Sequence, residues 1–299
     1  MSVLAALPGI VNVVAPVFVV AAVGFAWIRA RLPYDSAFIT TFAVNVSTPC
    51  LVFSSLVKAQ PGGATLAAMT TAAVATMGLA GLAGWLILKA ARVQGVRAYI
   101  SALSFPNAGN LGLPVCLFAF GEEGLSLAIL YFAAMAVAQF TIGPALAAGR
   151  FDWRMVLRTP VIYAVAAALL AVRLDMAVPV WIGNTTQLLG GCAVPLMLFS
   201  LGVALARLRP AGAGRAAVLS ALRLTLGLAA GFGVSAVLGL DGAMRGVVVL
   251  QSAMPVAVFN YLWALRYNNA PEEVAGMVLF STAMAFAGLP LLLLAVMPG

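Results

Sequence analysis

Long apolar runs divide this chain at nearly regular intervals, and they limit its fold more than any other feature. A helix needs roughly 20 apolar residues to cross the hydrocarbon core of a bilayer. Ten runs of about this length occur, at residues 8–30, 36–57, 63–89, 97–119, 123–148, 159–173, 180–206, 214–239, 243–267 and 272–297. Because the connections between them are brief, the sequence predicts a single all-α integral membrane bundle of ten transmembrane helices over residues 1–299.

Composition excludes the other broad classes. Of the 299 residues, 64% are hydrophobic and 8% are charged, whereas a soluble domain has roughly 25% charged residues. Sixteen basic and eight acidic side chains cannot cover the surface of a soluble protein of this length. The net charge of +8 is attributed to basic cytoplasmic loops next to the lipid bilayer, so we expect no nucleic-acid partner.

The sequence has few residues that could serve catalysis or metal binding. Histidine is absent, and Cys50, Cys116 and Cys192 lie far apart inside apolar runs. Zinc sites and Ser/His or Cys/His catalysis therefore lack their usual residues. We expect neither an enzyme nor a metal or cofactor site.

Lysine and arginine are distributed unequally between alternate connections. Twelve follow the first, third, fifth, seventh and ninth runs, and three lie on the opposite side, at Lys58, Arg173 and Arg245. By the positive-inside rule, both termini are predicted to be periplasmic in a bacterial inner membrane. Arg29 and Arg31 follow the first run and no basic residue precedes it, the reverse of a signal peptide, so this run is expected to remain as the first span.

Several landmarks recur in the same order in the two halves of the chain. Pro16, Pro49, Pro106 and the pair Glu122–Glu123 have counterparts at an offset that rises from 144 to 150 residues, namely Pro160, Pro195, Pro255 and Glu272–Glu273. The sequence therefore predicts two five-span repeats, residues 1–148 and 149–299. Five is odd, so the second repeat is inverted, an arrangement typical of secondary transporters with a substrate site near the midplane.

The fourth run is the least suited to a continuous helix. It contains Pro106, Asn107, Gly109, Asn110, Gly112 and Pro114. Proline lacks an amide donor, and glycine permits backbone that leaves the helical region. Unwound backbone at this depth must line a cavity or be buried in protein, and the helix that follows the break would direct its N–H groups toward an anion. Asn107 and Asn110 are candidate ligands; a kink repaired by neighbouring helices is the alternative.

The ninth run repeats this pattern with Gln251, Ser252, Pro255 and Asn260. Two facing breaks would form a crossing near the midplane, and a simple proline kink is the alternative. In the second and seventh runs, Pro49 and Pro195 indicate flexed helices, and Asn45 is a further candidate ligand. Gln139 and Gln187 are isolated and are interpreted as helix–helix hydrogen bonders.

Charges inside the runs bear on coupling. All eight acidic residues lie in connections or at the ends of runs, so no mid-membrane carboxylate is available as a proton carrier. A sodium ion held by neutral oxygens, or uniport, is compatible with this pattern. Arg223 lies inside the eighth run: it either snorkels or pairs structurally, or it faces the bundle and attracts an anionic substrate.

Four motifs carry a family resemblance: Thr48-Pro49-Cys-Leu-Val-Phe53-Ser54-Ser55-Leu56, Pro106 to Pro114, Met254 to Tyr267, and Leu279 to Pro290. They resemble the auxin efflux carrier family, which includes plant auxin exporters and bacterial malate or malonate permease-like proteins. The resemblance implies an NhaA/bile-acid-symporter-like fold in which spans 1, 2, 6 and 7 form a scaffold, spans 3–5 and 8–10 form a transport domain, and broken helices 4 and 9 cross. It also implies a homodimer. Gly227 departs from the proline frequent in relatives.

These observations predict a secondary transporter that moves a small organic anion by alternating access. The anion is expected to be a carboxylate, malate-, malonate- or auxin-like. The alternatives are a sodium-coupled organic-acid symporter of the same fold and a non-transporting membrane sensor. Substrate identity depends on the shape of the binding site, which one sequence does not give.

Overall fold

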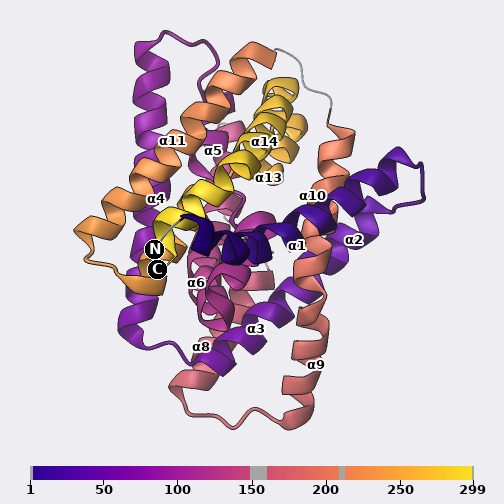
Figure 1. The fold of residues 1–299 in the computed structure, drawn as a ribbon, viewed down its shortest axis with the longest axis vertical. Helices are drawn as coiled ribbons and strands as arrows, with labels where there is room; N and C mark the ends of the chain where they lie inside the picture. The colour runs from indigo at the N-terminus through magenta and orange to yellow at the C-terminus, as the bar shows by residue number, and fades with distance from the viewer. Residues whose placement is uncertain (1–2, 149–159, 209–212, 298–299) are drawn as a thin grey trace.

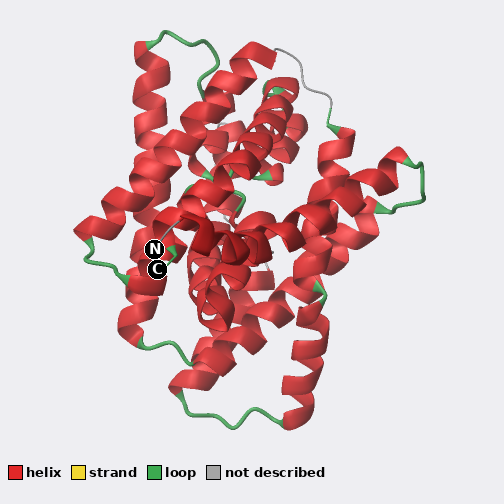
Figure 2. Ribbon diagram, in the orientation of Figure 1, coloured by secondary structure: helices red, strands yellow, loops and turns green. Residues whose placement is uncertain are grey.

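The computed structural model describes residues 3–148, 160–208 and 213–297, and the described part consists of helices joined by loops (Figure 2). The first half contains α1 (Val3–Arg29), α2 (Ser36–Phe42), the π-helix η1 (Ala43–Ser47), α3 (Thr48–Ala59), α4 (Gly63–Ala90), α5 (Arg97–Ser104), the π-helix η2 (Ala108–Gly112) and α6 (Leu113–Ala148). The second contains α8 (Pro160–Arg173), α9 (Val180–Gly191), α10 (Ala193–Arg207), α11 (Ala213–Val237), α12 (Gly242–Ser252), α13 (Val258–Arg266) and α14 (Pro271–Val296).

Seven helices in the described part are long and apolar enough to cross a membrane: 11–29, 36–59, 63–90, 108–143, 180–207, 213–237 and 271–296. The chain is therefore a multi-pass membrane protein. The sequence predicts ten spans, and local geometry accounts for the difference. The runs at 97–119 and 243–267 are each interrupted by a break, α8 has only 14 residues, and α6 joins the second part of the run at 97–119 to the run at 123–148.

Local sequence signals define several helix ends. Asp35 precedes α2, and its Oδ1 accepts hydrogen bonds from the backbone N–H groups of Ala37 and Phe38, an N-cap that satisfies otherwise free donors. Within α6, Gly121 has φ 64° and ψ −154°, a conformation that glycine tolerates. The chain changes direction there, between the two predicted spans that α6 contains.

The helices pack in two groups (Figure 1). In one, α1 lies along α10, and α3 packs against α8 and α9. In the other, α11 packs against α4, α12 and α14. Helix α6 contacts α1 and α3 of the first group and α4 and α12 of the second, so it joins the two.

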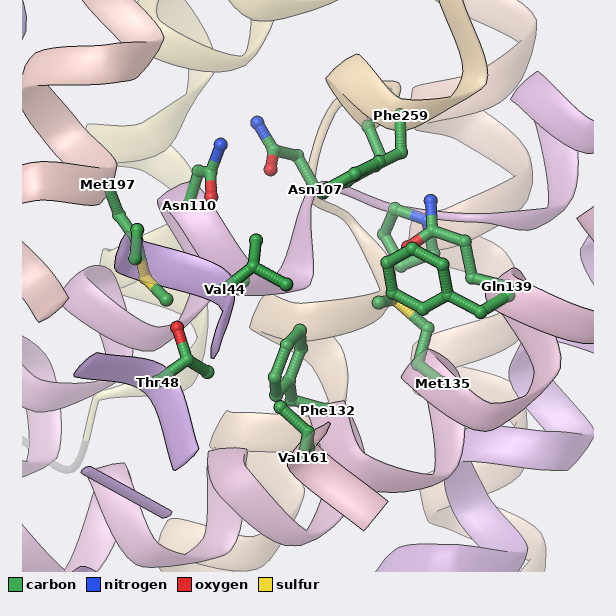
Figure 3. Close-up of a pocket in the computed structure, with 15 residues that line it drawn as sticks. Val44, Thr48, Asn107, Asn110, Phe132, Met135, Gln139, Val161, Met197 and Phe259 are labelled. Carbon is green, nitrogen blue, oxygen red and sulfur yellow. The ribbon is translucent and has the colours of Figure 1, made fainter. Parts of the chain in front are cut away.

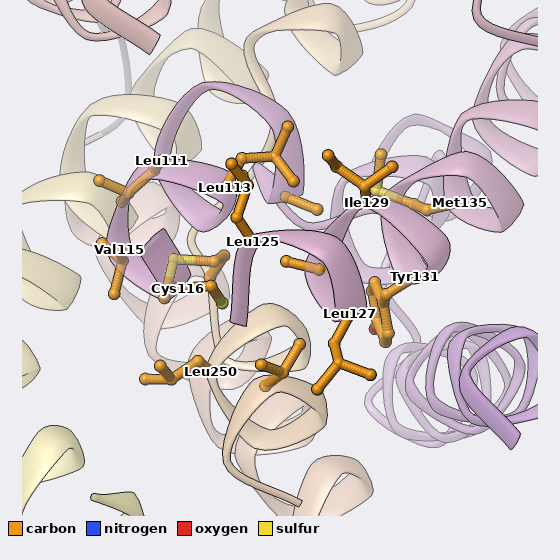
Figure 4. Packing of buried hydrophobic residues seen from close by; sticks show 14 of the residues in the cluster. Leu111, Leu113, Val115, Cys116, Leu125, Leu127, Ile129, Tyr131, Met135 and Leu250 are labelled. Carbon is orange, nitrogen blue, oxygen red and sulfur yellow. The ribbon is translucent and has the colours of Figure 1, made fainter. Parts of the chain in front are cut away.

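Glycine permits close approach between helices of the first group. A Cβ atom on Gly202 would meet the backbone of Ala21, and one on Gly24 would meet the backbone of Phe199. Small residues at helix interfaces are typical of membrane bundles, where van der Waals packing replaces the hydrophobic driving force. Elsewhere, buried side chains of α6 such as Leu125 and Ile129 pack with Leu250 of α12 in the main core (Figure 4).

Candidate functional site

Two interrupted helices meet at the centre of the fold. Helix α5 ends at Ser104, Phe105 is extended with φ −100° and ψ 109°, and helical geometry resumes at Ala108. Helix α12 ends at Ser252, and α13 begins at Val258. We call residues 105–107 and 255–257, which lie within these two gaps, the crossing.

The two segments of the crossing satisfy each other's backbone groups. Pro106 and Val256 form an isolated antiparallel bridge. The N–H of Asn107 donates to the carbonyl of Pro255 at 2.7 Å, and the N–H of Ala257 donates to the carbonyl of Phe105 at 3.3 Å. Non-helical backbone at membrane depth requires such partners, because lipid supplies none. The crossing is therefore a two-residue sheet inside a helical bundle.

Side chains reinforce this bridge. The amide Nδ2 of Asn260 donates to the carbonyl of Phe105 at 3.1 Å, and Ser101 Oγ donates to Asn260 Oδ1 at 2.8 Å. The N–H of Val256 donates to Ser281 Oγ at 3.0 Å. Asn260 thus holds α13 to the end of α5, with both ends of its amide engaged.

A cavity lies beside the crossing (Figure 3). Its volume, measured as the space open to the centre of a water molecule, is about 70 Å³. Polar side chains of Thr48, Asn107, Asn110 and Gln139 border it, together with an apolar wall and the backbone of the crossing: Ala43, Val44, Pro106, Gly109, Phe132, Met135, Phe140, Val161, Met197, Ala257 and Phe259. It is a mostly apolar site with a few convergent amides, the usual character of a small-molecule site.

Two amide groups of the cavity have unused donors. Asn107 is only 4% exposed, and its Nδ2 has no hydrogen-bond partner among the described residues. The same holds for Nε2 of Gln139. Asn110 is half-buried, and in Figure 3 its side chain lies next to that of Asn107. A buried amide donor without a partner costs free energy, and a ligand with a hydrogen-bond acceptor in this cavity would remove that cost.

Arg223 lies outside this lining. It is 1% exposed, and its Nη2 donates to the carbonyl of Ser252 at 2.8 Å, at the carboxyl end of α12. It therefore does not snorkel to the surface, as one of the alternatives proposed. Its Nε and Nη1 have no partner in the described part of the chain.

Comparison with known proteins identifies the family. Residues 9–150 and 144–293 match the family described as membrane transport protein, which accounts for nearly the whole chain. This chain belongs to that family. A relative named an uncharacterized transporter, from Methanothermobacter thermautotrophicus, is 29% identical over 267 residues, which cover 86% of this transporter and 88% of the relative.

Plant proteins give the second kind of match. Auxin efflux carrier component 1 of Arabidopsis thaliana is 28% identical over 149 residues, and component 3a of Oryza sativa subsp. japonica is 29% identical over 150 residues. Each match covers 48% of this transporter and 24% of the plant protein. The predicted membership of the auxin efflux carrier family is confirmed, and membership of a transporter family agrees with the expectation that the chain is not an enzyme.

The cavity of the transporter brings together only some of the predicted site residues. Pro106, Asn107, Gly109 and Asn110 line it. Gln251, Ser252 and Asn260 are buried outside the lining, on the α12–α13 side of the crossing. The Oγ of Ser252 donates to the carbonyl of Val249 at 3.1 Å, which is the local bonding of a simple kink. These three residues shape the crossing without reaching the cavity.

Asn45 was predicted as a ligand, but it does not line this cavity. It is exposed, whereas Val44 and Thr48 face the cavity from the same stretch of chain. The π-helical geometry of Ala43–Ser47 alters the phase of this helix, so side-chain direction does not follow from α-helical spacing.

Gly109 and Gly112 of the fourth run are needed because they are small, and their backbone conformation is one that other residues can adopt. Among described residues, the glycines with positive φ are Gly95, Gly121, Gly239 and Gly242, so Gly109 and Gly112 do not need that freedom. A Cβ atom on Gly109 would lie 2.9 Å from Phe132 Cε2, and one on Gly112 would collide with the amide of Gln251. Both glycines belong to the π-helix Ala108–Gly112, and close packing is what the structure requires of them.

Pro49 and Pro114 each follow a π-helical turn within a longer helix. Pro49 comes two residues after η1 in the helix 36–59, and Pro114 comes two residues after η2 in the helix 108–143. A proline inside a helix removes one backbone hydrogen bond, and single π-turns occur as bulges inside α-helices. Pro195 follows the junction at Cys192 between α9 and α10. The gap in the fourth run is confined to the residues around Pro106.

Gln139 is the cavity residue that the sequence interpretation missed. It was assigned to helix–helix bonding, yet it lines the cavity with a free amide donor. Its spacing from Phe132 and Met135 puts the three residues on one face of α6. In the sequence, the one indication of this was that Gln139 is a polar residue on the same helical face as Phe132 and Met135.

Proposed function

We propose that this transporter carries a small organic anion, a carboxylate, and binds it in the cavity beside the crossing. The observation that supports this most directly is the buried Nδ2 donor of Asn107, which has no partner in the described part of the chain. A carboxylate oxygen would accept from it, and a second oxygen from Asn110 or Gln139. The helix that starts at Ala108 adds the positive end of its dipole.

The size of the cavity favours a small substrate. A water molecule takes about 30 Å³ in the liquid, so 70 Å³ holds roughly two waters. Malonate, a very small dicarboxylate, would require this space to widen a little. Indole-3-acetate is larger and would require it to widen much further, so we favour a malonate- or malate-like substrate over an auxin-like one.

We further propose ten spans arranged as two inverted repeats, residues 1–148 and 149–299. Under this assignment the contact of α1 with α10 joins spans 1 and 7, and the contact of α3 with α8 joins spans 2 and 6. A two-fold relation exchanges these pairs, since it maps span 1 onto span 6 and span 2 onto span 7. The interruptions of α5–α6 and α12–α13 correspond in the same way.

Alternating access follows from where the cavity lies. Thr48, Val161 and Met197 line it from the helices of spans 2, 6 and 7, and Asn107 and Phe132 line it from the crossing and α6. Elevator-like or rocking movement of spans 3–5 and 8–10 against a scaffold of spans 1, 2, 6 and 7 would change which side of the membrane the cavity faces. The exposed apolar face of α9, with Trp181 at 70% exposure, is compatible with lipid contact or with a scaffold homodimer.

We assign the protein to a bacterial cytoplasmic membrane with both termini periplasmic. The connection after α4, which contains Arg92, lies at the upper end of Figure 1 and the one after α1 lies at its right edge, whereas the α3–α4 and α8–α9 connections lie at the lower end. This separation supports the positive-inside assignment.

The described residues favour transport that is not coupled to protons. Acidic residues that the structure describes lie at helix ends or in connections, and no group of three or more His, Cys, Asp or Glu occurs among them. No ordinary proton carrier or carboxylate-based sodium site is therefore present in this part of the chain.

Uptake into proteoliposomes tests the proposal. Purified transporter should accumulate radiolabelled malonate faster than protein-free liposomes, and Asn107→Ala should abolish most of this difference. Gln187→Ala, a change at an exposed position of α9 outside the cavity, is the control. Equal uptake by liposomes with and without protein, for malonate, malate and indole-3-acetate, would overturn the proposal. Strict dependence on sodium would favour the symporter alternative.

A further inference from the structure

Arg223 is a buried charge without an acidic partner. It lies ten residues after the start of α11, about 15 Å along the helix at 1.5 Å per residue. Its side chain is almost fully buried. The ion pairs in the described part of the chain, Lys58–Glu122 and Arg215–Glu273, do not include it. An unpaired buried charge is expensive, so a compensating negative charge is expected nearby.

The guanidinium is held at one point and free at two. Nη2 donates to the carbonyl of Ser252, where α12 ends and its dipole is negative. Nε and Nη1 have no partner among the described residues. Gly227 makes room for the group, because a Cβ atom there would lie 2.7 Å from Nη1 and would collide with the carbonyl of Ser252. A partial charge from one helix end offsets only part of a full positive charge.

The crossing connects this charge to the cavity. Ser252 is three residues before Pro255, whose carbonyl accepts the N–H of Asn107. Three residues span at most about 11 Å, so with the two hydrogen bonds at their ends, of 2.8 and 2.7 Å, the guanidinium lies within about 17 Å of the backbone of Asn107. It does not line the cavity. The backbone of the crossing separates the two.

We propose that Arg223 is a fixed countercharge for the bound anion. This inference rests on the proposed function. Arg223 attracts the substrate through the crossing without touching it. A resident positive charge disfavours a second cation close by, so binding is expected to need no sodium.

The attraction depends on the charge of the substrate. At an effective dielectric constant of about 20 and a separation of roughly 12 Å, each unit of negative charge gains about tenfold in affinity. A dianion therefore gains about a hundredfold, and an uncharged analogue gains nothing. A residue that merely supports the fold would change affinity equally for all three.

A charge series tests this. Malonate, malonamate and malonamide carry two, one and no negative charges on nearly the same frame. Calorimetric affinities are measured at pH 7.5 for the wild type, Arg223→Gln, Arg223→Met and Arg223→Lys, with Arg245→Gln, an exposed arginine, as the control. We expect Arg223→Gln and Arg223→Met to weaken malonate about a hundredfold and malonamate about tenfold, and to leave malonamide unchanged. Arg223→Lys should retain the charge dependence.

Three results would overturn the inference, and they are distinguishable. An equal loss for all three probes in Arg223→Gln and Arg223→Met means a structural role only. Wild-type affinity that falls at least tenfold when choline replaces sodium means that a coupling cation is needed, and this measurement requires no folded variant. Absence of wild-type affinity for every probe removes the proposed function itself, and the inference with it.

Discussion

The backbone N–H of Asn107 donates to the carbonyl of Pro255 at 2.7 Å, across 148 residues of sequence. This bond fixes the position of the Asn107 backbone, while its side-chain Nδ2 has no partner among the residues that the structure describes. The same residue therefore anchors the crossing through its main chain and offers a donor to the cavity through its side chain. A substitution of the side chain should separate these two roles.

Asn107→Ala and Asn110→Ala should weaken substrate binding more than they weaken folding. Each removes a hydrogen bond to a charged group, about 1.5–3 kcal/mol or roughly ten- to hundredfold in affinity. The amide of Asn107 has no partner to lose within the described structure, so the melting temperature should change little. Malonate affinity and melting temperature are measured for both, beside Gln187→Ala. Unchanged affinity with a clearly lower melting temperature would contradict the binding role.

Asn260→Ala should show the opposite ranking. Its amide bonds Ser101 and the carbonyl of Phe105. Removal leaves the buried Ser101 hydroxyl unpaired, at about 1–3 kcal/mol, while the carbonyl of Phe105 keeps only its bond from the N–H of Ala257. We expect a clearly lower melting temperature. Asn184→Ala, on the exposed face of α9, is the matched control, and equal stability of the two variants would argue against the tie between α13 and α5.

Gly112→Ala should destabilise the transporter through Gln251. The added methyl group would occupy the space of the Gln251 amide, and overpacking of this kind costs about 1–3 kcal/mol. The double variant Gly112→Ala/Gln251→Ala should recover much of this loss, because the second change removes the obstacle. Gly183→Ala, where the methyl group meets nothing within 4 Å, is the control. Additive losses in the double variant would show that the two residues do not compete for space.

Cysteine labelling should place the α3–α4 connection outside the cell. In a background with Cys50, Cys116 and Cys192 replaced, an impermeant maleimide should label Gly62→Cys in intact cells, because this connection carries few basic residues. Gln94→Cys, in the arginine-rich connection after α4, should react only after the membrane is opened. The reverse pattern would invert the topology.

The breaks in the fold are readable from sequence, but the direction of side chains is not. Pro106 and Pro255 remove backbone donors, so the positions of both interruptions follow from local chemistry. Asn45 is a candidate because it is an amide close to Pro49, and the direction of its side chain depends on the π-helical stretch Ala43–Ser47, which residue type alone does not reveal. A run that is apolar all round does not indicate which face is buried.

Contacts between distant segments were also beyond the sequence. The Gln251 amide leaves room only for glycine at position 112, and the side-chain amide of Asn260 is already hydrogen-bonded to Ser101 and Phe105. Each depends on the packing of the second half of the chain against the first. Without that arrangement, all polar residues near a break look equally suited to bind substrate.

The bridge between Pro106 and Val256 has a consequence for the order in which this protein is made. Ribosomes deliver the chain from the N-terminus at about 5–20 residues per second, so the segment at Phe105–Asn107 reaches the membrane well before its partner exists. Its polar backbone cannot rest in lipid meanwhile. Until the second half is synthesised, this segment therefore needs contact with water or with another protein. The crossing forms only after Val256 has been synthesised and inserted.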